Sequence, residues 1–560
     1  MQRIPRVIKK ERLFLLTSFI YVVSAFLIFP YLGYYVDNPD TISYINIARK
    51  YAQADFSNAV NGYWSPLISW ILALMLKFGG DDIMTFKYLQ LIIGWFVLFN
   101  FTKLLQSFIH SPALKIILSL SCVPFALSYS LLNLSPDFLF LSIVLFYLNY
   151  TSEKEFFNHR HFGLIAGVLG VLMYFSKSFG FLFFLIHFSI VLMRNIVQTK
   201  EYAFKRHLWK NYMQSMLYFL CISAIWIYLI SDKYGHFTIS ENVSFNLSRN
   251  VAAAPEEINR LPVLSGGLYL PPINNAVNAW EDPGLAVAVN TLHPFSSRAD
   301  FITYRQVLKR NFLSVYYFDF RRQTGTFFFI LLIAFLIFGK QKKFFTDDYF
   351  FSLFLTIILV YAGYSMILVH LRYVWICSLL MLLVSVWFIE ELPTGNKNLQ
   401  FPVKFVLVIL VVLIAIKRPI KEILYSSDKD VDIPALIISL SDPFKAIRQT
   451  YEYDAKLNAA RAGVKGKINA GSRIASLINT TGERDGYTQA SLMALYSNAY
   501  YLGQVSGSEP TLPQQLKKFN VDYLISFSRN TSLSDTLQGQ LIYTNGDLPV
   551  EVYSLKKING

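Results

Sequence analysis

The chain has 560 residues, of which 54% are hydrophobic and 16% are charged. Soluble domains carry about 25% charged residues, so this composition excludes a string of soluble domains, a disordered chain and a fibrous repeat, and three cysteines exclude a disulfide scaffold. A net charge of +15 would indicate nucleic-acid binding in a soluble protein, but much of the excess lies in short loops between apolar runs, so we expect no nucleic-acid partner.

Apolar runs of membrane-spanning length recur up to about residue 416. A bilayer core takes about 20 apolar residues per helix, which predicts a polytopic membrane domain over 1–416, beginning with a retained anchor. The remainder, 417–560, has short apolar runs among helical stretches and is predicted to be a small soluble α/β domain. The predicted spans lie near 13–33, 83–105, 113–131, 138–150, 162–177, 179–194, 211–231, 325–339, 349–368, 373–390 and 402–416.

The run from Trp64 to Gly79 decides the predicted topology. If it does not cross the membrane, the loops on the cytoplasmic side hold 19 Lys and Arg and the opposite short segments hold about six. If it crosses, the basic loops face outward, against the positive-inside rule. We therefore predict eleven spans, a cytoplasmic amino terminus, an outer carboxyl terminus, and a helix over 64–79 that lies in the outer interface or dips into it.

Two long outer loops follow from this topology. The first, 34–82, includes 40–54, where the spacing of apolar residues indicates a partly amphipathic helix. The second, 232–323, is expected to be ordered but irregular. The aromatic residues of the first loop fit a belt at the membrane surface better than a sugar-binding platform; they are Tyr34, Tyr35, Tyr63 and Trp64.

Four ionisable residues at the ends of predicted spans share the outer side. Charged groups at membrane depth cost roughly 2.5–3.5 kcal/mol each on insertion scales, so their presence needs a reason. Two carboxylates and two cations from distant segments on one leaflet indicate a site. They are Asp40 after the first span, Asp137 at the start of a span, Lys177 at the end of one, and Arg372, which with His370 and Tyr373 interrupts the apolar run from 349 to 390.

Each of the four has a structural alternative. Asp40 and Asp137 each follow a proline and could cap the helix they open, Lys177 could reach lipid headgroups, and Arg372 could anchor at the interface. A shared site explains better why all four fall on one face. There, a carboxylate can act as general base on a hydroxyl or amine, cations can hold a leaving lipid-linked phosphate, and an aspartate could instead position a divalent metal.

The order and common side of these motifs resemble the GT-C class of integral-membrane glycosyltransferases, in particular its protein O-mannosyltransferase-like and aminoarabinose-transferase-like branches. The resemblance covers nearly the whole chain. The segments that carry it are Asp40–Tyr44 (the Asp-x-x-x-Tyr segment of the first outer loop), Tyr63–Leu67 (the Pro-Leu motif), Pro136–Leu139 (the second acidic motif), Gly167–Phe179 (the glycine-rich span ending in Lys), His370–Tyr373 (the basic-Tyr motif associated with donor phosphate) and Leu516–Tyr523 (common in outer C-terminal domains).

The resemblance implies an α-helical polytopic GT-C fold with about 11 transmembrane helices, outer-interface helices and a small C-terminal extracytoplasmic α/β domain. It implies an enzyme of a bacterial cytoplasmic membrane that moves a sugar from a polyprenyl-phosphate donor to a glycan, lipid or protein acceptor at the outer face, with inversion. The loops 34–82 and 232–323 would form and cover the active-site face, and 417–560 would help to choose the acceptor.

The resemblance also implies roles for single residues. Asp40 would be the general base and Asp137 a second catalytic carboxylate that positions the acceptor or a metal. The residues that would bind donor phosphate or substrate are Tyr44, Lys177, His370, Arg372 and Tyr373.

Two alternatives stay open. The aminoarabinose branch carries a Glu-Lys pair before the Pro-Leu motif that serves metal and phosphate, and this chain has aromatic or small residues there. A divalent metal ion, held by Asp40 and Asp137 if at all, is therefore left open as a cofactor. The alternative function is a transporter or flippase of polar or lipid-linked substrates, although charges at one interface and the lack of related halves argue against it.

Overall fold

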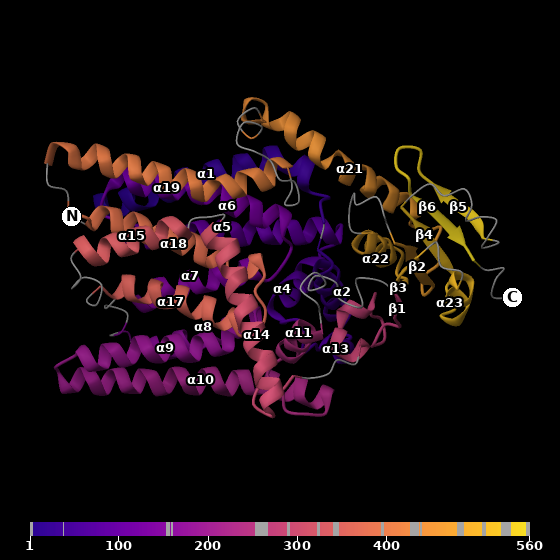
Figure 1. Cartoon of the computed structure of the whole chain (residues 1–560), viewed down its shortest axis with the longest axis horizontal. Coiled ribbons are helices and arrows are strands. Elements are labelled where there is room, and N and C mark those ends of the chain that lie inside the picture. The colour runs from indigo at the N-terminus through magenta and orange to yellow at the C-terminus, as the bar shows by residue number, and fades with distance from the viewer. Residues whose placement is uncertain are drawn as a thin grey trace.

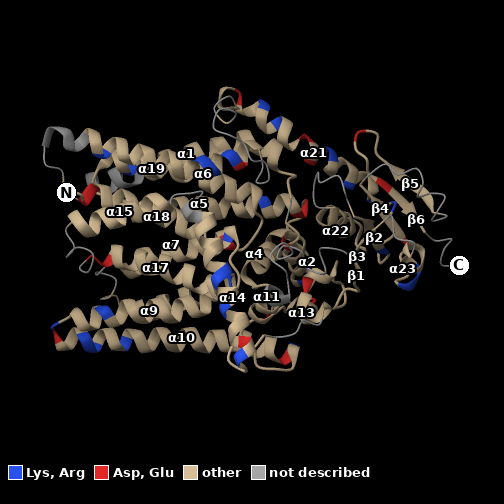
Figure 2. Ribbon diagram, in the orientation of Figure 1, with Lys and Arg blue, Asp and Glu red and all other residues tan. Residues whose placement is uncertain are grey.

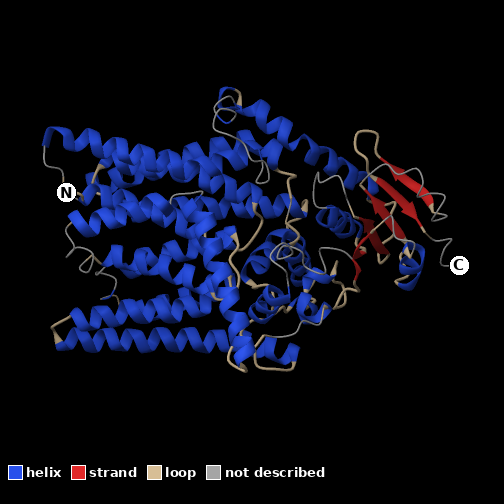
Figure 3. Cartoon of the chain, in the orientation of Figure 1, coloured by secondary structure: helices blue, strands red, loops and turns tan. Residues whose placement is uncertain are grey.

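Long helices running side by side make up most of the first three-quarters of the chain (Figures 1 and 3). The computed structural model describes residues 4–36, 38–152, 157, 159, 161–252, 267–287, 292–321, 325–339, 347–393, 397–425, 436, 439–478, 486–506, 511–527 and 539–555. The long helices are α1 (Ile4–Leu32), α5 (Asp82–Phe108), α6 (Pro112–Leu132), α7 (Asp137–Ser152), α8 (Phe162–Ser176), α9 (Phe179–Gln198), α10 (Tyr202–Tyr234), α15 (Gly325–Phe338), α17 (Asp348–Ser365), α18 (Trp375–Glu391) and α19 (Lys397–Tyr425).

Each of these helices corresponds to one predicted span, and the chain is a helical, multi-pass membrane protein. Among the described residues, six helices are long and apolar enough to cross a membrane, namely α1 from Arg12 onward, α5, α6, α9, α10 and α17. Three more, α7, α8 and α15, are shorter apolar helices that pack against longer neighbours. The middle stretches of the bundle carry few charged residues, which lie mainly near helix ends (Figure 2).

The amino terminus lies at one end of the bundle, and the opposite end carries short helices and a sheet (Figure 1). We call this opposite end the sheet end. Its helices are α2 (Asp40–Ala52), α3 (Phe56–Ala59), α4 (Leu67–Leu76), α11 (Glu241–Ala252), α13 (Pro283–Ala286) and the 18-residue α14 (Arg298–Val315), with single turns η2 (Ala279–Glu281) and η4 (Leu371–Tyr373) and a π-helical turn η3 (Tyr316–Arg321).

The run from Trp64 to Gly79, which decides the predicted topology, contains helix α4. It has 10 residues, and at 1.5 Å per residue it is about 15 Å long, half of a hydrocarbon core of about 30 Å. It packs against α2, α5 and α8. Its length agrees with the prediction that this run does not cross.

The tail of the chain forms the small α/β unit expected from its composition. It contains α21 (Pro443–Val464), β2 (Arg473–Leu477), α22 (Gly486–Ser497), β3 (Tyr500–Val505), α23 (Leu512–Lys518), β4 (Tyr523–Ser526), β5 (Gln540–Thr544) and β6 (Glu551–Ser554). The sheet order is β1-β3-β2-β4-β6-β5, with β2 parallel to β3 and β4 and the other pairs antiparallel. Helix α19 runs on to Tyr425, past the expected domain boundary at 416.

The edge strand β1 (Gly267–Leu268) comes from the second long loop rather than from the tail. It pairs with β3, where Gly503 has φ +134°, a region that only glycine enters readily. A Cβ at Gly503 would also collide with the carbonyl oxygen of Gly267. A glycine is therefore needed for the loop to join the sheet.

Helix α22 fastens the tail to the helix bundle beside α2. Arg49 of α2 donates to the carbonyl of Leu495 at 2.8 Å, and Gln489 donates to the carbonyl of Val36 at 3.0 Å. Tyr496 donates to Asp81, the N-cap of α5, at 2.6 Å. These contacts hold α2, which carries Asp40, between the bundle and the tail.

Candidate active site

Asp40 is the first residue of α2, and its carboxylate points away from the helix it opens. Pro39 is the N-cap, and the backbone N–H of Asp40 donates to the side chain of Asn38 at 3.1 Å, so the capping alternative does not describe what the Asp40 carboxylate does. Its Oδ1 accepts a hydrogen bond from Nε1 of Trp280 at 2.8 Å, and its Oδ2 pairs with Arg372. The residue is 4% exposed.

The four ionisable residues singled out in the sequence form one connected chain of charges. Arg372, in η4 between α17 and α18, pairs with Asp40 and lies 3.8 Å through Nε from Oδ2 of Asp137. Lys177, between α8 and α9, pairs with Oδ1 of Asp137. The two carboxylates and two cations cancel in formal charge, which lowers the desolvation cost of burying them together.

The predicted aromatic partners lie beside these charges, whereas His370 lies at their edge. The Nζ of Lys177 is 3.7 Å from the ring centroid of Tyr373. Tyr44 and Tyr373 line the same cavity as the four charges. His370 is exposed and outside that lining, with its ring centroid 5.6 Å from that of Tyr373. Its predicted role in phosphate binding stays a prediction.

Asp40, Asp137, Lys177 and Arg372 line one part of a cavity of about 240 Å³. From there an apolar lining continues between α9 and α17, made by Phe179, Leu182, Phe183, Ile186, Leu359, Ala362, Gly363 and Ile367. Of these, Leu182 and Ile186 are 49% and 44% exposed on the surface of the bundle. The cavity therefore reaches the side of the bundle that faces lipid.

Residues 239–246 contribute uncharged side chains to the lining, both apolar and polar. The polar ones are Ser240 and, from α11, Asn242 and Asn246. Tyr63 and Trp64 line the cavity too and are only 5% and 6% exposed.

The prediction of a surface belt is wrong for most of the aromatic residues of the first loop. Tyr35 is 2% exposed, and Tyr63 and Trp64 stack edge to face on each other with centroids 4.5 Å apart. Tyr63 and Trp64 are buried because the second loop folds over the first, where Trp280 packs against both. Tyr35 packs instead against Tyr451 of α21.

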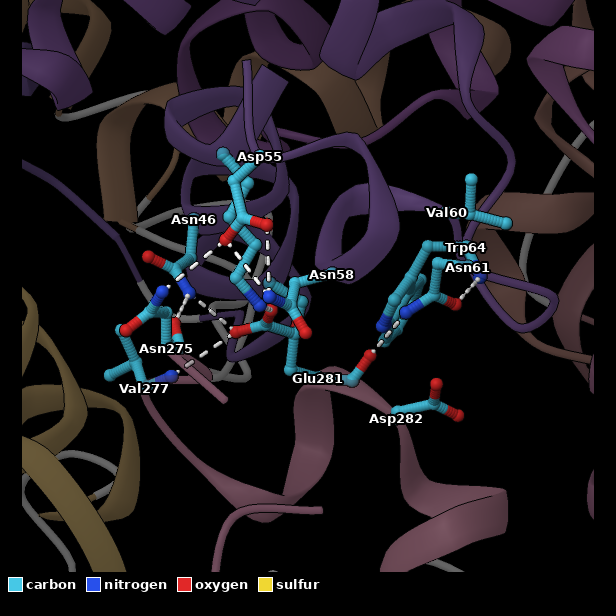
Figure 4. A network of polar contacts seen from close by, with 12 residues as sticks. Asn46, Asp55, Asn58, Val60, Asn61, Trp64, Asn275, Val277, Glu281 and Asp282 are labelled. Atoms are coloured by element: carbon cyan, nitrogen blue, oxygen red, sulfur yellow. Dashed lines mark hydrogen bonds and ion pairs between the residues drawn. The ribbon is translucent and has the colours of Figure 1, made fainter. Parts of the chain in front are cut away.

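Residues 277–283, which we call the Trp280 turn, contact α2 and Asp40, and no contact of this kind was expected from the sequence. Glu281 is 1% exposed and accepts from Lys50 at 2.5 Å. It also accepts from Asn46 at 2.7 Å (Figure 4). Ser43 donates to the carbonyl of Trp280 at 3.4 Å.

A sequence signal for these contacts exists in α2. Asp40, Ser43, Asn46 and Lys50 recur every three to four residues, so they form a polar stripe on one helix face. The helix over 40–54 is predicted from its apolar residues alone, and this polar stripe is not used.

Asp282 fastens the same turn to the end of α10. It is fully buried and accepts from Tyr234 at 2.7 Å and from Lys233 at 3.1 Å. Burial raises the pKa of the Asp282 carboxyl above its ordinary value, against the opposing effect of Lys233.

The described residues do not form a complete set of metal ligands on their own. Within the described parts of the chain, no group of three or more His, Cys, Asp or Glu side chains could hold a metal ion. Asp40 and Asp137, the two residues considered for this role, are each paired with a cation of the protein, so a divalent ion held by these carboxylates and a substrate phosphate would have to displace those partners.

A likeness to known proteins is found among solved structures. No protein-family model matches the chain, and no curated protein matches its sequence. Among solved structures, ArnT from Cupriavidus metallidurans bound to undecaprenyl phosphate is similar over 97% of this chain and 99% of that chain, with 12% identity and a TM-score of 0.50.

The apo state of the same ArnT is similar over 97% of this chain and 98% of that chain, with 12% identity and a TM-score of 0.50. An oligosaccharyltransferase from Archaeoglobus fulgidus in the apo form is similar over 92% of this chain and 69% of that chain, with 11% identity and a TM-score of 0.44. The chain thus has the fold of ArnT, a GT-C glycosyltransferase, and the resemblance seen in its motifs is confirmed at the level of the fold.

Proposed function

We propose that the protein is a membrane glycosyltransferase that moves a sugar from a polyprenyl-phosphate donor to a hydroxyl or amine of a glycan, lipid or protein. The reaction would take place at the outer face of a bacterial cytoplasmic membrane, to which we assign the sheet end. The observation that carries the proposal is the cavity in which Asp40, Arg372, Asp137 and Lys177 stand at the head of an apolar groove. The shared fold of ArnT, which was crystallised with undecaprenyl phosphate, supports it.

The two parts of the cavity match the two parts of a lipid-phosphate donor. Arg372 and Lys177 offer guanidinium and ammonium donors to a phosphate, which they bind by charge-assisted hydrogen bonds. The groove between α9 and α17 offers apolar surface to a polyprenyl chain and reaches the side of the bundle, where Leu182 and Ile186 are exposed. A donor that enters from the membrane would place its phosphate beside Arg372 and Lys177.

Asp40 is the proposed general base. It would take the proton from the acceptor hydroxyl or amine as the acceptor attacks C1 of the sugar. The bond between C1 and the phosphate oxygen breaks, the electron pair leaves with polyprenyl phosphate, and attack from the opposite side inverts the anomeric centre. Arg372 and Lys177 would stabilise the extra negative charge on the leaving phosphate, and Asp137 would hold both cations in place.

The experiment uses the purified full chain in lipid nanodiscs with undecaprenyl-phosphate sugars that are radiolabelled in the sugar. Glucose, galactose, mannose and aminoarabinose donors are offered with a cell-envelope fraction as acceptor. We expect transfer from one of these donors, and a loss of roughly 100-fold or more in Asp40→Asn, in keeping with the usual contribution of a general base.

The matched control is Asp547→Asn, since Asp547 is an exposed carboxylate beyond β5 and far from the cavity lining. Unchanged turnover in Asp40→Asn would refute the assigned base. Movement of labelled lipid across proteoliposome membranes without release of sugar would refute the transferase and favour the transporter.

A further inference from the structure

We propose that Trp280 is a positioning residue for Asp40, and that the Trp280 turn fixes the direction in which this carboxylate faces the cavity. The inference rests on the proposed role of Asp40 as general base. It assigns a task to the second long loop beyond covering the cavity.

The hydrogen bond between the two side chains carries the inference. The indole Nε1–H of Trp280 donates to Oδ1 of Asp40 at 2.8 Å, and Trp280 is 4% exposed. An indole is a donor only, so it orients the carboxylate without competing for the proton. Since Oδ2 pairs with Arg372, both oxygens have partners, and the plane of the carboxylate is set by two groups from distant segments.

The indole is itself held in place. Its ring packs against those of Tyr63, Trp64 and Phe245, with centroids 5.7, 5.9 and 6.1 Å away. The carbonyl of Trp280 accepts from Nε1 of Trp64 at 3.3 Å. The ring has little room to turn, so its N–H direction is determined by packing.

The next residue in the chain anchors the turn to the helix that carries Asp40. The carboxylate of Glu281 accepts from Lys50 and Asn46 of α2 and from the backbone N–H of Val277 at 3.1 Å (Figure 4). Its carbonyl accepts from Asn61 at 2.8 Å. Asp40 and Trp280, its orienting donor, are therefore tied together by a network of hydrogen bonds between α2 and the Trp280 turn. We expect this network to hold the indole N–H at a fixed position relative to the carboxylate.

The first test compares Trp280→Phe with wild type in the transfer assay. Phe keeps the aromatic packing and removes the N–H. We expect kcat to fall about 10- to 100-fold, the usual effect of losing one hydrogen bond to a charged group. KM for the donor and the affinity for undecaprenyl phosphate should stay unchanged, because Arg372 and Lys177 are intact. Trp226→Phe is the control, since Trp226 is buried in α10 against Trp70 and Phe175, outside the cavity lining.

The second test is a double-mutant cycle with Asp40→Asn. If Trp280 acts through Asp40, Trp280→Phe costs no further activity in the Asp40→Asn background. A merely structural role would cost the same factor in both backgrounds. An equal loss in both backgrounds overturns the inference and leaves the proposed function standing.

The third test needs no turnover. The chain has eight Trp, and in protein labelled with 15N at the indole the signal of Trp280 is the one lost in Trp280→Phe. We expect this signal to move in Asp40→Asn while that of Trp226 stays, because a hydrogen bond to a charged oxygen is replaced by a neutral one. An unmoved Trp280 signal overturns the inference. Absence of transfer from all donors by wild type overturns the proposed function and the positioning role together.

Discussion

The guanidinium of Arg372 pairs with the carboxylate of Asp40 across 332 positions of the sequence. The same guanidinium approaches Asp137, so a turn between α17 and α18 joins the acidic residues that open α2 and α7. A cation placed between two carboxylates near a lipid-facing groove can exchange these partners for a donor phosphate.

Arg372→Ala should therefore impair donor binding as well as turnover. It removes the cation between two buried carboxylates and leaves Lys177 alone to meet the phosphate. We expect undecaprenyl phosphate to bind at least about tenfold more weakly and kcat/KM to fall about 100-fold. Arg372→Lys should lie between, because an ammonium lacks the fork of the guanidinium. Arg305→Ala, on the exposed face of α14, is the control, and an unchanged affinity in Arg372→Ala would contradict the phosphate site.

A bulky side chain in the groove should discriminate between long and short lipid phosphates. Ala362 of α17 lines the cavity, whereas Ile358 of the same helix is 47% exposed and outside the lining. We expect Ala362→Trp to weaken binding of undecaprenyl phosphate about tenfold or more, by filling apolar surface that the chain would cover. Binding of a ten-carbon prenyl phosphate should change less, and Ile358→Trp should affect neither. Equal effects of both variants, measured by titration in nanodiscs, would argue against this path for the chain.

The ion pair between Lys50 and Glu281 should matter for stability. Both side chains are buried, at 2% and 1% exposure. Glu281→Gln keeps the shape and leaves Lys50 without a counter-charge, which should lower the free energy of unfolding by about 3–5 kcal/mol. Thermal unfolding in detergent should show a clear fall in Tm. Lys456→Met, in the exposed pair of Lys456 with Glu452, should leave Tm unchanged, and the idea fails if the two variants behave alike.

Chelators should leave the activity largely intact. The carboxylates of Asp40 and Asp137 are each neutralised by a cation of the protein, so a divalent ion would have to compete with Arg372 and Lys177 for them. We expect turnover in the transfer assay to change by less than about twofold after EDTA treatment. A loss of activity that added Mg²⁺ or Mn²⁺ restores would show that a metal takes part.

The topology can be tested with reporter fusions. Alkaline phosphatase fused after residue 560 should be active, since eleven spans place the sheet end outside, and fused after residue 199, between α9 and α10, it should be inactive. Green fluorescent protein at the same positions should give the opposite pattern. An inactive phosphatase at residue 560 would place the cavity in the cytoplasm and contradict the proposed donor.

Much of the site could be predicted because its signals are local. A carboxylate or lysine at the end of an apolar run is visible in one short segment, as with Asp137 and Lys177, and hydropathy with loop charge then assigns its side. The burial of Tyr63 and the hydrogen bond of Trp280 to Asp40 left no such trace. The hydrogen bond joins residues 240 positions apart. A Tyr next to a predicted span has the same local sequence whether its ring lies at the membrane surface or is buried under a folded loop.

The sequence by itself determined the helical membrane fold, the positions of the bundle helices and the gathering of Asp40, Asp137, Lys177 and Arg372 at one end. These follow from the cost of placing charge and unpaired backbone in lipid, which acts on every segment separately. Only the tertiary structure decided which groups touch. It placed Trp280 on Asp40 and left His370 at the edge, because hydrogen bonds and ring packing depend on how two loops far apart in the chain fold over each other.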